Sequence, residues 1–236
     1  MPERVDAPEL LDQDAGTLDD VRANLDEMWR LGAMLGGLRG LTAHLLPMIE
    51  TALANSETAT VADLGTGGGR LPVYLAEWAR RNRLNLQVFG LDLSARNLNI
   101  AQKNTGTHRE IQLMRGDVLA LPFASGSIDV FTSSLFLHHF APDALARLLR
   151  ETYRIARRGI VMNDITRGDL PLAAFRLVQP VFARHELTRR DGITSIRRAY
   201  TPDELLQIAR DAGLSHARIY RHFPWRMTLV ADKRDV

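Results

Sequence analysis

The feature that most constrains the fold is an alternation of short apolar runs and longer amphipathic segments between residues 60 and 165. Apolar runs of strand length predict strands over residues 60–64, 87–91, 111–115, 128–132 and 159–165. Helical patterns follow the first two of these strands and precede the last one, over residues 141–156. Strands that alternate with helices form parallel βαβ units, in which helices cover both faces of the sheet. The chain is therefore predicted to be an α/β protein with a doubly wound, mostly parallel sheet.

The segment before this alternation is predicted to be mainly helical. Residues 1–17 are acidic and are expected to form a flexible lead-in. Residues 18–50 carry apolar side chains at helical spacing and are interpreted as a helical cap with a joint at Gly36 and Gly37. Pro47 is expected to stop the last helix of this cap, because a proline inside a helix removes a backbone hydrogen bond.

The alternation also breaks off after residue 165. Residues 166–199 contain an apolar helical run and then a polar, arginine-rich stretch, and are interpreted as a lid or substrate insertion. The sequence Thr201-Pro202-Asp203-Glu204 is a capping box that begins the next helix, and two strand-like runs follow it. Because no internal repeat or second core pattern is present, residues 18–236 are predicted to form a single domain.

Composition excludes several classes of protein. The 236 residues include no cysteine, which rules out thiolate nucleophiles, cysteine-bound metals and disulfide-stabilised scaffolds. No apolar run approaches the ~20 residues that span a bilayer, and the polar N-terminus is unlike a signal peptide, so a cytoplasmic protein without a membrane span is expected. The net charge is only +2, and basic residues do not interleave with aromatic ones, so no nucleic-acid partner is expected.

Residues suited to binding a nucleotide-like ligand are found at the ends of four predicted strands in succession, the fourth of which leads into the run from Ser133 to His139. The first strand ends in Asp63 and a glycine loop, residues 65–69, the second ends in Asp92, and the third is followed by Asp117. Each feature alone is explained equally well as a turn or a helix N-terminus. Their order at successive strand ends favours a ligand site, because ligands of such sheets bind outside the carboxyl ends of the strands. A G-x-G-x-x-G dinucleotide fingerprint would need glycine at position 70, where the chain has Arg70; this disfavours a nicotinamide-dependent oxidoreductase.

Over roughly residues 58–165 the chain resembles the class I S-adenosylmethionine-dependent methyltransferases. Segments similar to the motifs of that family read VADLGTGGG, VFGLDLS and LMRGDVLALPFASGSIDVFTSSLFLHHF. The resemblance implies a Rossmann-like sheet, S-adenosylmethionine as cofactor and S-adenosylhomocysteine as product. The segments LHH and RRDGITSIRRAYTPDELLQIARDAGL resemble bacterial small-molecule methyltransferases of polyketide or quinone pathways. The (N/D)-P-P-(Y/F) motif of DNA-methylating members is absent; its place is taken by Ser133-Ser134-Leu135-Phe136.

The same resemblance implies which residues bind the cofactor. The methionine part and the ribose would contact Asp63 and the loop backbone at Gly65, Thr66, Gly67 and Gly69. Asp92 would hold the ribose hydroxyls, Leu93 would pack on the adenine, and Asp117 with Val118 would bind the adenine edge. Ser133 and Ser134 would lie beside the methionyl end.

Histidines supply the candidate general bases. A phenolic acceptor with a pKa near 10 gains from a base, typically about 10²–10⁴-fold. His139, just after the fourth strand, and His185, in the arginine-rich stretch near Asp191, are the candidates, and His138 is interpreted as structural. No metal site is expected. Five arginines of this stretch would either clamp an anionic substrate or form plain surface: Arg184, Arg189, Arg190, Arg197 and Arg198.

The sequence therefore favours a methyltransferase for a small, hydrophobic acceptor of phenolic or polyketide-like type. Methylation of oxygen is favoured over methylation of carbon, and a homodimer is possible. Three alternatives stay open: a methyltransferase acting on protein or RNA, a nicotinamide-dependent oxidoreductase and a non-catalytic protein that binds the cofactor.

Overall fold

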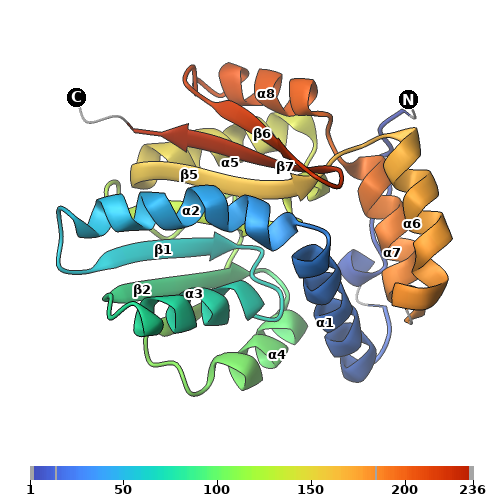
Figure 1. Ribbon diagram of the computed structural model, residues 1–236, viewed down its shortest axis with the longest axis horizontal. Coiled ribbons are helices and arrows are strands. Elements are labelled where there is room, and N and C mark those ends of the chain that lie inside the picture. The colour runs from blue at the N-terminus through green and yellow to red at the C-terminus, as the bar shows by residue number, and fades with distance from the viewer. Residues whose placement is uncertain (1–2, 14, 184, 234–236) are drawn as a thin grey trace.

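A computed structural model describes residues 3–13, 15–183 and 185–233. Seven strands form one sheet in the order β3-β2-β1-β4-β5-β7-β6 (Figure 1). The strands are β1 (Ala59–Leu64), β2 (Leu86–Asp92), β3 (Ile111–Arg115), β4 (Ile128–Ser134), β5 (Ala156–Ile165), β6 (Arg218–His222) and β7 (Arg226–Asp232). Strands β1 to β5 pair in parallel, and β7 pairs antiparallel with both β5 and β6. The predicted Rossmann-like α/β fold with a mostly parallel sheet is confirmed.

Helices cover the sheet on both faces. The α-helices are α1 (Leu18–Met34), α2 (Gly37–Leu53), α3 (Arg70–Arg81), α4 (Ala95–Thr105), α5 (Pro142–Ile155), α6 (Asp169–Phe182), α7 (Glu186–Arg198) and α8 (Pro202–Asp211), with short 3₁₀ helices η1 (Leu11–Gln13) and η2 (Leu137–His139). One apolar core joins α2 and α3 to the sheet, and a second core joins α5 and α8 to its other face. None of the helices in the described ranges is long and apolar enough to cross a membrane.

The carboxyl ends of β1 and β5 point toward a group of helices that do not cover the sheet faces. Figure 1 shows α1, α6 and α7 standing together at this end, beyond the arrowheads of the two strands. Helix α7 packs against α1, α6 and η2. The cap and the insertion therefore meet at the edge of the sheet where a parallel α/β protein binds its ligands.

The structure differs from the expected helix end at Pro47, because α2 continues through it to Leu53. The proline lacks the N–H that would donate to the carbonyl of Ala43, a loss of roughly 3 kcal/mol. Leu45, Ile49 and Ala52 are fully buried on the face of α2 that packs on the sheet. Burial of each large aliphatic side chain contributes about 1.5–3 kcal/mol, which offsets that loss.

The acidic segment before the cap also differs from the expected flexible lead-in. In residues 3–13, the backbone N–H of Val5 donates to the carbonyl of Arg197 at 3.2 Å, and the Arg4 side chain donates to the carbonyls of Arg198 and Phe140, both at 2.7 Å. The side chain of Glu9 is 3% exposed. Long-range contacts of this kind leave no trace in local periodicity. We refer to residues 3–13 as the N-terminal segment.

The polar stretch after residue 185 forms a helix, α7, which the pattern of apolar residues in the sequence did not predict. Thr188, Asp191, Ser195 and Arg198 are buried on one face at helical spacing. Because polar side chains occupy this buried face, the apolar periodicity that normally marks a helix is missing. The capping box that begins α8 is present as predicted, with Thr201 and Glu204 reciprocally bonded.

Candidate functional site

A cavity of about 720 Å³ lies at the carboxyl ends of β1, β2 and β4. The glycine loop after β1 and the loop after β2 line one part of it, and α1, the N-terminal segment and η2 line other parts. A volume of this size is typical of sites for cofactors and small molecules, which occupy roughly 300–1,000 Å³.

The glycine loop contains residues with a left-handed backbone conformation, and neighbouring side chains pack closely against it. Gly65 has φ +66°, and a Cβ there would overlap the ring of Phe136. Gly67 has φ +52° and donates its N–H to Asp92 Oδ2 at 2.8 Å. Leu25 of α1 lies 3.2 Å from the place where a Cβ on Gly67 would stand, so α1 covers the loop directly. Glycine is therefore required here by both backbone conformation and space.

Asp63 is an almost fully buried carboxyl group at the end of β1. Its Oδ2 accepts a hydrogen bond from the Thr66 hydroxyl at 2.8 Å. Burial raises the pKa of Asp63 to about 7, and the nearby charge of Asp92 adds to the effect. A carboxyl group with a raised pKa beside a cavity is typical of a binding or catalytic site.

Asp92 lies at the end of β2 with its two oxygens already oriented. Besides Gly67, the N–H of Ser94 donates to Oδ1 at 2.9 Å, and the side-chain amide of Asn97 donates to the same oxygen at 3.3 Å. Burial raises the pKa of Asp92, although these hydrogen bonds oppose the shift. The side chain is held rigidly at the cavity wall.

Apolar and polar groups gather where the adenine is expected. Leu93 lines the cavity although 65% of it is exposed, and the buried Val118 lines it from the loop after β3. Asp117 lies beside Val118, accepts the N–H of Leu119 at 2.9 Å and is exposed. Leu93 and Val118 therefore offer apolar surface to a flat ring in this part of the cavity.

The structure brings most, but not all, of the predicted cofactor residues to the cavity. Of the described residues, its lining includes Asp63, Gly65, Thr66, Gly67, Asp92, Leu93, Asp117, Val118 and Ser134. Gly69 lies outside it as the residue before α3, where its N–H donates to the carbonyl of Thr66. Ser133 is also outside, because its side chain is fully buried in β4.

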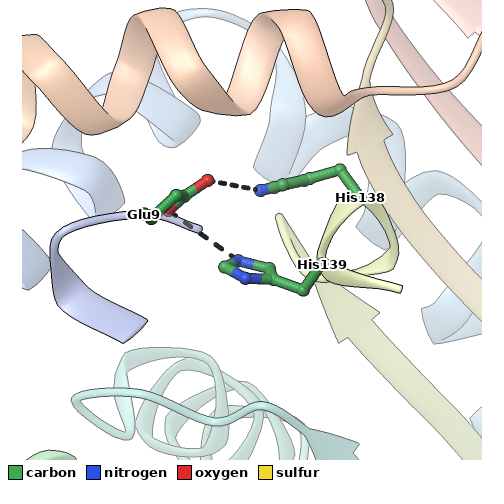
Figure 2. A group of neighbouring side chains, drawn as sticks. All are labelled: Glu9, His138 and His139. Carbon is green, nitrogen blue, oxygen red and sulfur yellow. Dashed lines mark ion pairs between the residues drawn. The ribbon is translucent and has the colours of Figure 1, made fainter. Parts of the chain in front are cut away.

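His139 is the candidate base that lines the cavity. Its Nδ1 lies 3.2 Å from Asp12 Oδ2, and its Nε2 lies 3.9 Å from Glu9 Oε2. Figure 2 shows Glu9 facing both His138 and His139, which follow one another on η2. The two acidic residues come from the N-terminal segment, which the sequence did not connect with the site.

His138 lies behind His139, fully buried between two carboxylates. Its Nδ1 is 2.9 Å from Asp164 Oδ1, and its Nε2 is 3.2 Å from Glu9 Oε1. Glu9, His138 and His139 also bring possible metal-ligand atoms within 4.8 Å of one another. We interpret the group as an ion-pair network, because each nitrogen of His138 already faces a negatively charged carboxylate.

The other candidate base, His185, lies away from the cavity lining formed by the described residues. It precedes α7, where its backbone N–H donates to Glu27 at 3.3 Å. Its candidacy as a catalytic base is therefore not supported: the turn into α7 places it beside α1 rather than beside the glycine loop.

The described arginines of the insertion are not among the residues that line the cavity. Arg189, Arg190 and Arg197 are exposed on α7, and Arg190 pairs with Glu186 at 2.6 Å. Arg184 lies outside the described residues. Arg198 is buried and donates to the carbonyls of Ala7 and His139 at 3.1 and 2.8 Å, so it ties the N-terminal segment to η2.

The cavity fits S-adenosylmethionine on its own chemistry. The loop backbone is free of side chains at Gly65 and Gly67, and Asp63 and Asp92 offer carboxylates for an ammonium group and for hydroxyls. Asn97 is among the residues that line the cavity, and its side-chain amide helps to orient Asp92 there.

Comparisons with known proteins agree with this site. Residues 62–162 match the family model described as a methyltransferase domain. The chain is 31% identical over 165 residues to a demethylmenaquinone methyltransferase of Roseiflexus castenholzii, covering 65% of this chain and 66% of that protein, just under two thirds. It is 29% identical over 221 residues to a demethylmenaquinone methyltransferase of Lactiplantibacillus plantarum, covering 87% of this chain and 89% of that protein.

Solved structures share the fold. A SAM-dependent methyltransferase from Aquifex aeolicus has a TM-score of 0.55 at 18% identity, covering 78% of this chain and 88% of that one. Magnesium protoporphyrin IX methyltransferase from Synechocystis, solved with bound SAH, has a TM-score of 0.54 at 17% identity and covers 97% and 89% of the two chains. These matches show the fold and a methyltransferase domain over residues 62–162, and the motifs and the cavity are similar to those of class I S-adenosylmethionine-dependent methyltransferases.

Proposed function

We propose that the protein transfers the methyl group of S-adenosylmethionine to a small hydroxylated aromatic molecule, at oxygen in preference to carbon. The observation that carries the proposal is the position of His139. It lines the same cavity as Asp63 and Asp92, together with residues of the N-terminal segment. Relatives named demethylmenaquinone methyltransferases support an acceptor of quinol type.

The protein has two main tasks in this reaction: to align the acceptor with the methyl donor and to remove the proton of the acceptor hydroxyl. The bound cofactor supplies an electrophilic methyl group on a sulfonium. Alignment of acceptor and donor contributes about 7–11 kcal/mol to the lowering of the barrier. The imidazole of His139 takes the proton of the acceptor hydroxyl, which turns a weak phenol nucleophile into a phenolate.

The lining of the cavity favours a small acceptor over a macromolecule. Trp29 and Met28 of α1, Asp191 of α7 and Leu11 of the N-terminal segment all line it. A cavity that is lined by several elements and by apolar side chains of α1 is the usual form of a site for a small molecule.

The test uses S-adenosylmethionine with a ¹³C-labelled methyl group and naphthalene-1,4-diol under reducing conditions. The product is analysed by mass spectrometry, and ¹³C NMR distinguishes an O-methyl from a ring C-methyl group. We expect an O-methyl product, and a loss of about 10²–10⁴-fold in kcat for His139→Gln. The matched control is His216→Gln, which changes an exposed histidine between α8 and β6.

Two results would overturn the proposal. One is the absence of labelled product from the diol and from simple phenols. The other is equal activity of His139→Gln and His216→Gln. A ring C-methyl product would retain the acceptor class and correct the atom that is methylated.

A further inference from the structure

We infer that Asp12, on the N-terminal segment, is a positioning residue for methyl transfer that fixes the tautomer and direction of the His139 ring. The inference rests on the proposed role of His139 as general base. It gives the acidic N-terminal segment a role in the reaction in addition to packing.

The carboxylate of Asp12 is held in one place by three donors. Its Oδ2 faces His139 Nδ1 at 3.2 Å, and the backbone N–H of Glu9 and the guanidinium of Arg198 each donate to it at 3.2 Å. Arg198 is itself buried and bonded to the carbonyl of His139. The base and its carboxylate partner are therefore anchored by the same arginine.

Two residues of α7 also anchor the segment that carries Asp12, through contacts that do not involve His139. Asp191 accepts the backbone N–H groups of Leu10 and Leu11 at 2.7 and 3.2 Å. Glu9 accepts the hydroxyl of Ser195 at 2.6 Å. These contacts hold the segment at the cavity, so the position of Asp12 does not depend on its bond to His139 alone.

The carboxylate determines which nitrogen of His139 carries the proton. Burial would raise the pKa of Asp12, but its interactions with His139 and Arg198 lower it to about 2, so the group is ionised at neutral pH. An ionised carboxylate only accepts hydrogen bonds, so Nδ1 must be the donor and Nε2 keeps its lone pair. Nε2 lies 3.9 Å from Glu9 Oε2, beyond hydrogen-bond distance, so it remains available to an acceptor hydroxyl.

In this arrangement the proton and both electron pairs of the transfer step are accounted for. The hydroxyl proton passes to His139 Nε2, the oxygen electron pair forms the bond to the methyl carbon, and the carbon–sulfur bond breaks with its electron pair left on sulfur. The imidazolium that results has Asp12 beside Nδ1 and Glu9 beside Nε2.

The first test reads the tautomer directly and needs no acceptor. We would label the histidines with ¹⁵N and assign the His139 ring through its loss in His139→Gln. The wild-type ring is expected to carry its proton on Nδ1 at neutral pH. In Asp12→Asn the amide can donate to the ring, so the proton is expected to move in large part to Nε2; Asp12→Glu is expected to restore the wild-type signature in part.

The second test is kinetic, with naphthalene-1,4-diol as the probe acceptor. Asp12→Asn is expected to lower kcat by about 10²–10⁴-fold and to change the KM for the diol little, the pattern of a base held in the wrong tautomer. The matched control is Asp19→Asn, which changes an exposed carboxylate on the first turn of α1. Unfolding temperatures of all variants show whether a loss comes from misfolding.

The inference is overturned if the His139 ring in the wild type carries its proton on Nε2. It is equally overturned if Asp12→Asn and the control Asp19→Asn show the same His139 tautomer, or if the two variants have the same kcat. Failure of the proposed function gives a different result. In that case the wild type methylates no phenol, while the tautomer still depends on Asp12.

Discussion

His138 Nδ1 lies 2.9 Å from Asp164 Oδ1, and the ring is closed on its other side by Glu9 at 3.2 Å. Burial by itself would lower the pKa of His138, but the two carboxylates raise it to about 10. The ring is therefore an imidazolium at neutral pH, sealed beneath the cavity. Its neighbour His139, whose ring centroid lies 4.5 Å from that of His138, is the one that lines the cavity.

The first prediction concerns stability against pH. The folded protein keeps the His138 proton up to about pH 10, whereas the unfolded chain releases it near pH 6.5. The stabilisation is complete below pH 6.5 and is lost as the pH rises toward 10. We expect the free energy of unfolding, measured by urea titration, to fall by at least about 1.4 kcal/mol between pH 7 and 9. His138→Gln should remove this slope; an unchanged slope in that variant would contradict the assignment.

The second prediction concerns cofactor binding against pH. Because the pKa of Asp63 is raised to about 7, the free protein holds a proton there at acidic pH, and an incoming ammonium group favours its release. The affinity for S-adenosylmethionine is expected to increase roughly tenfold from pH 5.5 to 7, before the α-amino group of the ligand itself titrates. Calorimetry in two buffers of different ionisation enthalpy should show proton release. Equal pH dependence in Asp63→Asn would show that another group is responsible.

The third prediction separates backbone strain from close packing in the glycine loop. Gly213 has φ +89° with open space around it, whereas Gly65 has φ +66° and the Phe136 ring in the way. Gly213→Ala should cost about 1–2 kcal/mol of stability through its backbone alone. Gly65→Ala should cost more and should also weaken cofactor binding. Equal losses in the two variants, measured by thermal unfolding, would mean that the Phe136 contact has no role.

The fourth prediction concerns the N-terminal segment. Arg198 donates to carbonyls of this segment and of η2, and hydrogen bonds to a charged group contribute about 1.5–3 kcal/mol each. Arg198→Gln should therefore increase hydrogen exchange at the amides of Leu10 and Leu11, as followed by mass spectrometry. The exposed neighbour Arg197 provides the control, Arg197→Gln. Unchanged protection in Arg198→Gln would show that the segment is held without this side chain.

The sheet and half of the site could be predicted because their signals are local. Each strand is a short apolar run, and Asp63, Asp92 and Asp117 follow such runs directly in sequence. Parallel pairing then brings the ends of β1, β2 and β3 to one edge, so the order along the chain translates into proximity. The position of His139 at the cavity could be predicted for the same reason, since it follows β4.

The rest of the site depends on contacts that local patterns do not encode. Glu9 and Asp12 belong to a segment without strand or helix periodicity, and they reach the cavity through bonds to Ser195 and Arg198, more than 180 residues away. The face of α7 that binds Glu9 and Asp12 is polar, so its sequence pattern predicts a solvent-exposed face rather than a buried one. The nearest sequence signal was the acidic character of the segment, which equally fits a solvated lead-in.

The most direct test of the central claim follows the labelled methyl group in a cell extract. The protein is incubated with radiolabelled S-adenosylmethionine, and the mixture is separated into a solvent-extractable fraction and a precipitated macromolecular fraction. Asp92→Asn, which alters a side chain bonded to the glycine loop at 2.8 Å, serves as the inactive control. The account predicts label in the solvent-extractable fraction that is lost in the control. Label confined to precipitated protein or RNA would contradict it.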